Sequence, residues 1–184
     1  ADVFEFLRGD LDANSGNLNL DVGSGRHRLL VSDEAASAGD SGVTISDTIG
    51  TPNGNGGFDE TGAAEIQIKG LAFGDITYGA KGVTASNFYD GISYWSGAGD
   101  DTITIDGTHY RAGERTTTQL NTGLGDDHIT VDLDTGEDDF FALNAMGGAA
   151  SHSPVDPDLT ASDDDTVRAA ASTLPLIIFG GWGS

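Results

Sequence analysis

The chain has 184 residues, and its 30 acidic against 8 basic side chains give a formal net charge of −22 at pH 7. This charge excludes nucleic-acid binding as the main role, because a polyanion is recognised by basic surfaces. The absence of cysteine from the sequence excludes disulfides and thiolate metal sites, so we expect any cross-linking ion to be held by oxygen ligands.

Short runs of alternating or β-branched residues, bounded by glycine, aspartate or asparagine, are typical of β-strands. In chain order we expect strands at residues 3–7, 18–22, 28–32, 43–46, 65–69, 76–78, 92–95, 102–106, 116–121, 128–133, 140–144 and 174–179. The sequence keeps no apolar stripe with the spacing of an amphipathic helix. It therefore predicts an all-β chain, for which a sandwich, a barrel and a stacked solenoid all remain open.

The segments between these strands suggest how the chain is organised. Residues 50–59 and 147–165 are predicted to be long loops, and we expect the second, which is acidic and rich in serine, alanine and proline, to be mobile. The longest strongly apolar run, residues 174–179, is far shorter than the roughly 20 residues of a membrane helix, so we expect no membrane span. We interpret residues 1–184 as one segment of a longer protein.

Two segments of the chain repeat almost literally. Ser-Gly-Ala-Gly-Asp-Asp-Thr-Ile-Thr at residues 96–104 returns 26 residues later as Thr-Gly-Leu-Gly-Asp-Asp-His-Ile-Thr at residues 122–130. A weaker copy at residues 22–30 carries His27 in place of the second acid, and residues 180–184 match only the glycines. A period in the twenties followed by a strand favours a parallel, β-helix-like solenoid with isolated Gly-x-Gly-x-Asp turns.

The pattern Gly-x-Gly-x-Asp-x-Ile-x in the two complete copies resembles the hemolysin-type, or repeats-in-toxin, calcium motif. The resemblance implies that turn glycines let main-chain carbonyls converge on calcium, that a carboxylate completes the site, and that Ile103 and Ile129 point inward. The implied metal-site residues are Ser96, Ala98, Asp100, Asp101, Thr122, Leu124, Asp126 and Asp127. Because the copies are not back to back, the layout is closer to repetitive regions of large bacterial surface and secreted proteins.

Other interpretations of these residues stay open. Glycine and aspartate can close tight turns without an ion, with the aspartate side chains accepting backbone N–H bonds. In the weaker copy His27 removes the carboxylate, and Arg26 and Arg28 either place a guanidinium beside neighbouring acids or are solvated surface cations. The four histidines share no metal-ligand spacing, so we expect surface histidines rather than a zinc site. The threonines near residues 102–104, 116–118 and 130 fit ordinary β-propensity better than a ladder.

We expect a non-enzymatic structural module with calcium as its cofactor. It would form part of a secreted or cell-surface solenoid in a large bacterial surface, matrix or filament protein, serving adhesion or scaffolding. The expected partners are calcium ions, neighbouring coils or identical subunits stacked into a fibre, and extracellular polysaccharide.

Two other classes of protein compete with this expectation. A parallel β-helix polysaccharide lyase or epimerase is disfavoured by the shortage of basic residues. A binding module would take ice through threonines, or carbohydrate through aromatic residues, and those aromatic candidates are Tyr78, Tyr89, Tyr94, Trp95 and Tyr110.

Overall fold

The computed structural model describes residues 2–6, 9–22, 25–49, 51–52, 58–59, 65–79, 88–109, 116–133, 140–145, 164–173 and 175–180. Strands make up nearly all of the regular structure in these residues, and the helix among them is the single 3-10 turn η1 (Leu11–Ala13). Most of the predicted mobile loop at residues 147–165 lies outside the described residues.

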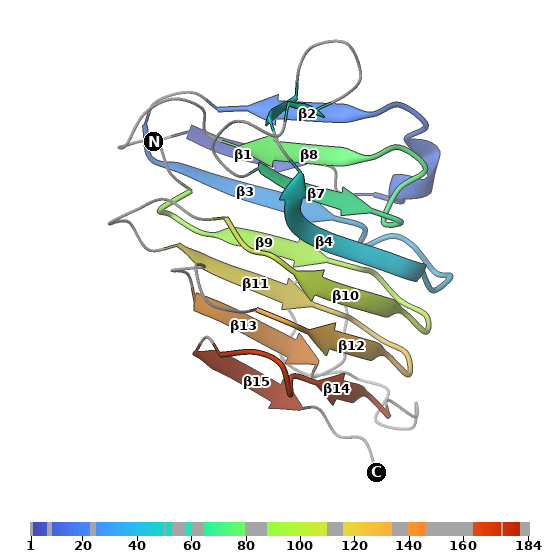
Figure 1. Cartoon of the computed structure of the whole chain (residues 1–184). Helices are drawn as coiled ribbons and strands as arrows, with labels where there is room; N and C mark the ends of the chain where they lie inside the picture. The colour runs from blue at the N-terminus through green and yellow to red at the C-terminus, as the bar shows by residue number, and fades with distance from the viewer. Residues whose placement is uncertain are drawn as a thin grey trace.

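The first of two large sheets has six strands, and all of its neighbouring pairs are parallel (Figure 1). In spatial order its strands are β1 (Asp2–Phe6), β3 (His27–Ser32), β9 (Ile92–Trp95), β11 (Thr117–Asn121), β13 (Phe140–Ala145) and β15 (Leu176–Gly180).

The second large sheet has seven strands of mixed direction. In spatial order they are β14 (Thr166–Arg168), β12 (His128–Val131), β10 (Thr102–Asp106), β4 (Ser41–Ile49), β7 (Glu65–Lys69), β8 (Ile76–Gly79) and β2 (Leu18–Asp21). The pairs from β14 to β4 are parallel, as is β2 with β8, whereas β7 is antiparallel to both β4 and β8. A separate antiparallel pair joins β5 (Thr51–Pro52) and β6 (Phe58–Asp59).

The expected parallel β-solenoid is therefore wrong. Between β4 and β8 the chain reverses direction twice, and this reversal makes the seven-stranded sheet a mixed one. Residues 70–75 join β7 to β8, and a parallel crossover needs roughly a dozen residues or more. Gly70 turns the chain there at a φ of 80°. The repeat at residues 96–130 carries no trace of this hairpin, so the repeat alone suggested a uniform coil.

The positions of the individual strands agree closely with the sequence. Each of the twelve predicted strands matches an observed strand to within a few residues at either end. The described residues also contain three strands that were not predicted, namely β5, β6 and β14. The first two lie in the stretch predicted as a loop at residues 50–59, which is thus partly paired.

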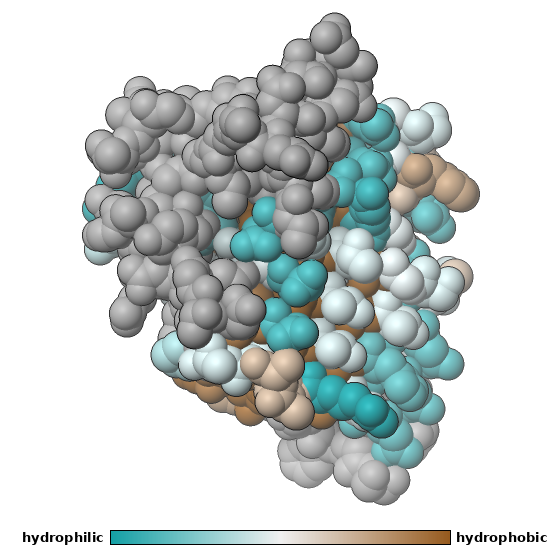
Figure 2. Space-filling model, in the orientation of Figure 1, coloured by the Kyte–Doolittle hydropathy of each residue, from teal (hydrophilic) through white to brown (hydrophobic). Residues whose placement is uncertain are grey.

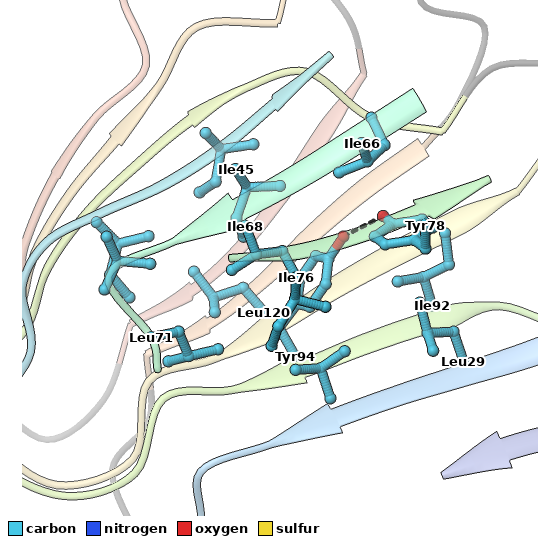
Figure 3. Packing of buried hydrophobic residues seen from close by; sticks show 14 of the residues in the cluster. Leu29, Ile45, Ile66, Ile68, Leu71, Ile76, Tyr78, Ile92, Tyr94 and Leu120 are labelled. Carbon is cyan, nitrogen blue, oxygen red and sulfur yellow. Dashed lines mark hydrogen bonds between the residues drawn. The ribbon is translucent and has the colours of Figure 1, made fainter. Parts of the chain in front are cut away.

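The hydrophobic core lies between the two large sheets. Side chains alternate between buried and exposed along β10 and β12, as expected for strands with one face on a core. In Figure 3, Ile45 and Ile68 of the mixed sheet lie on the same core as Leu120 of the parallel sheet. The hydroxyls of Tyr78 and Tyr94 form a buried hydrogen bond, so the largest polar side chains of the core satisfy one another.

The chain passes alternately between the two sheets from β9 to β15. Figure 1 shows the resulting ladder of strands, with β1 and β2 at one end and β14 and β15 at the other. The turn from β9 to β10 therefore lies beside the turn from β11 to β12. This arrangement brings together turns that are far apart in the sequence.

Candidate functional site: a stack of acidic turns

Three turns whose residues are all described lead from a strand of the parallel sheet to a strand of the mixed sheet. Residues 33–40 join β3 to β4, residues 96–101 join β9 to β10, and residues 122–127 join β11 to β12. Since the strands on both sides of these turns are neighbours, the three turns lie on top of one another. Residues 164–165, which precede β14, add a fourth level. We call this arrangement the acidic turn stack.

Main-chain hydrogen bonds hold the two Gly-x-Gly turns together. The N–H of Gly99 donates to the carbonyl of Leu124 at 2.6 Å, and the N–H of Ser96 donates to the carbonyl of Asn121 at 3.1 Å. The Ser96 hydroxyl adds a bond of 3.0 Å to the carbonyl of Thr122. The copies that are isolated in sequence are thus direct neighbours in space.

The turn glycines are required for two reasons, which Gly99 and Gly125 illustrate. Their φ values are 109° and 133°, which side chains with a Cβ rarely adopt. A Cβ on Gly125 would also overlap the carbonyl group of Gly99 in the next turn. The positive φ and the close stacking of the turns are thus two separate constraints on these positions.

Four aspartates form a column along the buried side of the stack, which we call the aspartate column: Asp40, Asp101, Asp127 and Asp165. The backbone N–H of Asp40 donates to Oδ1 of Asp101 at 2.7 Å, and that of Asp101 donates to Oδ1 of Asp127 at 2.9 Å. The N–H of Asp127 continues the series to Oδ1 of Asp165 at 3.0 Å. Each level of the stack is therefore tied to the next by a carboxylate.

A second row of aspartates runs along the exposed side of the same turns. The N–H of Asp126 donates to Oδ1 of Asp100 at 3.0 Å, and the N–H of Asp164 donates to Oδ1 of Asp126 at 2.9 Å. These bonds run in the opposite direction to those of the aspartate column. Asp100 and Asp126 thus connect neighbouring turns.

The carboxylates of Asp101 and Asp127 are almost completely buried, with relative exposures of 1% and 0%. Oδ2 of each is buried and accepts no hydrogen bond of good geometry from the described residues. Burial raises the pKa of Asp127 to about 7, opposed by the Asp101 amide and the Thr122 hydroxyl. Burial likewise raises the pKa of Asp101, opposed by the Ser96 hydroxyl and the Asp40 amide. Ionisation here is costly without a compensating charge.

The first turn of the stack begins with an acid where the other two begin with a hydroxyl residue. The N–H of Asp33 donates to the carbonyl of Trp95, as that of Ser96 does to Asn121. Asp33 is fully buried, and its Oδ1 accepts a hydrogen bond of 2.6 Å from the N–H of Leu11. Burial raises the pKa of Asp33 to about 7, and the charge of Asp40 adds to this effect.

Asp40 closes the same turn and is similarly perturbed. Burial is the main cause that raises its pKa to about 6, followed by the charge of Asp101. The neighbouring Asp33 side chain opposes part of the shift. Two neighbouring buried carboxyl groups can both be ionised only at a cost in free energy.

The side-chain and main-chain oxygen atoms of the stack are of the chemical type that binds a hard cation. Calcium takes six to eight oxygen ligands with loose angular demands, and the buried Oδ2 atoms of Asp101 and Asp127 are of this type. The carbonyls of Thr122 and Leu124 already accept hydrogen bonds, but a carbonyl oxygen has a second lone pair. No group of three or more acidic or histidine side chains in the described ranges is arranged to hold a metal. An ion would therefore need main-chain oxygens and water as well.

The structure brings all eight predicted metal-site residues into the acidic turn stack. Ile103 and Ile129 are 1% exposed and directly paired, which confirms their inward direction. Sequence reasoning missed Asp33, Asp40 and the pair at residues 164–165. The last was detectable, because Asp-Asp-Thr-Val at residues 164–167 repeats the Asp-Asp-Thr-Ile of residues 100–103.

The weaker copy at residues 22–30 does not join the stack. It leads into β3 of the parallel sheet, whereas the complete copies lead into β10 and β12 of the mixed sheet. Arg26 forms an ion pair of 2.9 Å with Asp90, in line with the guanidinium interpretation. The expectation of surface histidines is wrong for His27 and His109, which are 2% and 1% exposed.

The described residues form only part of the surfaces proposed for binding sugar or ice. Tyr78 and Tyr94 are core residues at 1% exposure, and Tyr110 lies outside the described residues. Thr104 pairs with Thr130 across the mixed sheet, but the neighbouring Thr102 pairs with His128. On the face drawn in Figure 2, the described side chains are mostly hydrophilic or near neutral in hydropathy.

Among the residues that the structure describes, no helix has the length and apolar character needed to span a membrane. Comparison with known proteins finds no matching family model, no matching curated protein and no matching solved structure.

Proposed function

We propose that this chain is a non-enzymatic structural module whose acidic turn stack is stabilised by calcium. The observation that carries the proposal is the aspartate column, in which Asp101 and Asp127 each keep a buried Oδ2 without a well-placed donor among the described residues. A buried carboxylate in this position needs a proton or a cation. The motif resemblance and the oxygen-only chemistry of the chain favour calcium.

The charge of the chain supports a role outside the cell, where calcium is plentiful. At −22 the chain repels itself, and bound calcium offsets part of that repulsion inside the stack. Extracellular calcium modules bind at about 10⁻⁴ to 10⁻³ M, so such a module would be loaded only after export. We therefore propose a secreted or cell-surface scaffold that becomes rigid where calcium is present.

A calcium titration of the folded chain by calorimetry at pH 8 tests this proposal. We expect saturable binding in the range of about 10⁻⁴ to 10⁻³ M. The double variant Asp101→Asn, Asp127→Asn should lose the ions of the motif turns while keeping the Oδ1 acceptors of the column. Equal numbers of bound ions in the wild type and in this variant would overturn the proposed site.

We also propose that copies of this chain associate end to end. Both end strands of the parallel sheet expose apolar side chains: Val3 of β1 is 62% exposed, and Ile178 and Phe179 of β15 are 44% and 51% exposed. Strands with an open edge pair readily with another strand. β1 of a second copy can pair with β15 of the first, and this pair would be parallel like the other pairs of the sheet.

Sedimentation velocity in calcium at moderate salt tests this association, since salt screens the acidic repulsion. We expect mass to grow with concentration for the wild type and Ile178→Lys to reduce the growth. A chain that stays monomeric at high concentration under these conditions would contradict end-to-end association.

A further inference from the structure

The first turn of the acidic stack differs from the two motif turns at one equivalent position. Ser96 and Thr122 begin the motif turns, and their hydroxyls lie against the carboxylates that close those turns, Asp101 and Asp127. Asp33 holds the same place in the first turn and lies against Asp40. A hydroxyl can donate a hydrogen bond to a carboxylate, whereas an ionised carboxylate cannot.

The Asp33 and Asp40 side chains are poorly supplied with donors. Asp33 is completely buried, and its Oδ1 accepts one bond, from the N–H of Leu11. Oδ2 of Asp33 and Oδ2 of Asp40 are both buried, and neither accepts a hydrogen bond from a donor in the described part of the chain. Two neighbouring buried carboxylates cannot both be charged unless something positive lies between them.

Further acids surround this pair. Asp10 caps η1 through a bond of 2.9 Å from the N–H of Asp12, and both of these acids act electrostatically on Asp33 and Asp40. Asp101 adds its charge from the next level of the stack. Five aspartates therefore act on one another around the first turn, although this turn has no Gly-x-Gly motif.

We infer that Asp33 and Asp40 form a second kind of divalent-cation site, in which Oδ2 of both residues binds one calcium ion. The remaining ligands would be main-chain oxygens and water, which calcium accepts readily. The inference takes the identity of the ion from the proposed function, but it does not depend on calcium binding at the motif turns. In this arrangement a calcium ion is bound in the first turn of the acidic turn stack, directly before the two Gly-x-Gly turns.

Asp33→Asn is the sharpest test, because asparagine keeps the Oδ1 acceptor for Leu11 and offers an N–H donor to Asp40. With calcium alone as the probe, equilibrium dialysis at pH 8 should show one fewer bound ion per chain than the wild type. In chelator the same variant should melt at a higher temperature than the wild type, because the buried charge pair is gone. Asp106→Asn on the exposed side of β10 removes the same net charge and should change neither result.

Two further variants separate failure of this inference from failure of the proposed function. Asp40→Asn should also lose one ion, which covers the case in which Asp33→Asn does not fold. If the motif turns bind nothing, Asp101→Asn with Asp127→Asn will keep the wild-type ion count while Asp33→Asn still loses one. An unchanged ion count in Asp33→Asn and in Asp40→Asn, with unchanged melting in chelator, would overturn the inference.

Discussion

The backbone N–H of Asp101 donates a hydrogen bond of 2.9 Å to Oδ1 of Asp127, 26 residues further along the chain. One oxygen of the Asp127 carboxylate thus joins two turns, while the other oxygen is buried beside the Thr122 hydroxyl. Asp127 can therefore link the two turns through Oδ1 and bind a cation through Oδ2. The interpretation of these aspartates as turn acceptors and their interpretation as ligands are therefore compatible.

Substitutions of Asp127 should separate these two roles. Asp127→Ala removes the acceptor of the Asp101 amide, so we expect a loss of about 1–3 kcal/mol in the free energy of unfolding, with or without calcium. Asp127→Asn keeps Oδ1, so it should lose the stability that calcium adds while being at least as stable as the wild type in chelator, where no buried charge remains at this position. Chemical denaturation in chelator and in calcium measures both effects. Equal behaviour of the two variants in chelator would mean that the inter-turn bond contributes nothing.

The stacking of the turns predicts that Gly125 cannot carry a side chain. Gly125→Val combines a φ of 133° with overlap against the carbonyl group of Gly99, so it should destabilise the fold in chelator and in calcium alike. Gly16→Val is the matched control, because no heavy atom other than those of its chain neighbours lies within 4 Å of the position of its Cβ. A wild-type melting temperature for Gly125→Val would show that the turns are not stacked as described.

The buried acids predict an unusual dependence of stability on pH in chelator. The pKa values of Asp33 and Asp127 are raised from 3.8 to about 7, and that of Asp40 to about 6. The folded state therefore binds more protons than the unfolded state between about pH 4 and pH 7, so stability falls as pH rises through this range and levels off above it.

Thermal melting from pH 4.5 to pH 8.5 in chelator measures this dependence. The double variant Asp33→Asn, Asp127→Asn should show a flatter profile, because two of the responsible carboxyls are gone. Calcium should add most stability above pH 7, where these groups are ionised. A melting temperature that rises steadily with pH in chelator would contradict the assigned burial of the acids.

The stability of the core beside the stack should depend on the apolar residues that follow each turn. Ile129 is 1% exposed and pairs with Ile103 and Val167, so Ile129→Ala should cost about 2–5 kcal/mol. The neighbouring Thr130 is exposed, and Thr130→Ala should change stability by about 0.5 kcal/mol or less. Denaturant midpoints check both values, and equal losses would place Ile129 outside the core.

The sequence predicted the strands well because each strand carries its own local signal. Runs such as Ile92–Trp95 and Thr102–Asp106 alternate between core and solvent, and glycine and aspartate mark their ends. The inward direction of Ile103 and Ile129 was implied by the resemblance of the repeat to the calcium motif. The antiparallel β7 had no such signal, because the direction of pairing is set by the length of the connections and by partners distant in sequence.

The site was predicted in part for a related reason. The residues at 96–101 and 122–127 share a motif, so they were found together. Asp33 and Asp40 carry no shared motif, and only the stacking of β3 on β9 and of β4 on β10 brings them into line with the motif turns. Burial of a carboxylate also cannot be read from a chain in which acids are this common.

Thermal melting of the wild type at pH 8, in chelator and in about 10 mM calcium, tests the central claim most directly. If one site binds with a Kd of about 10⁻⁴ M, this concentration adds about 2.7 kcal/mol, which corresponds to a rise of about 5 to 10 °C for a domain of this size. We expect at least this rise for the wild type and a smaller rise for the variant Asp101→Asn, Asp127→Asn. Superimposable melting curves in chelator and in calcium would contradict it.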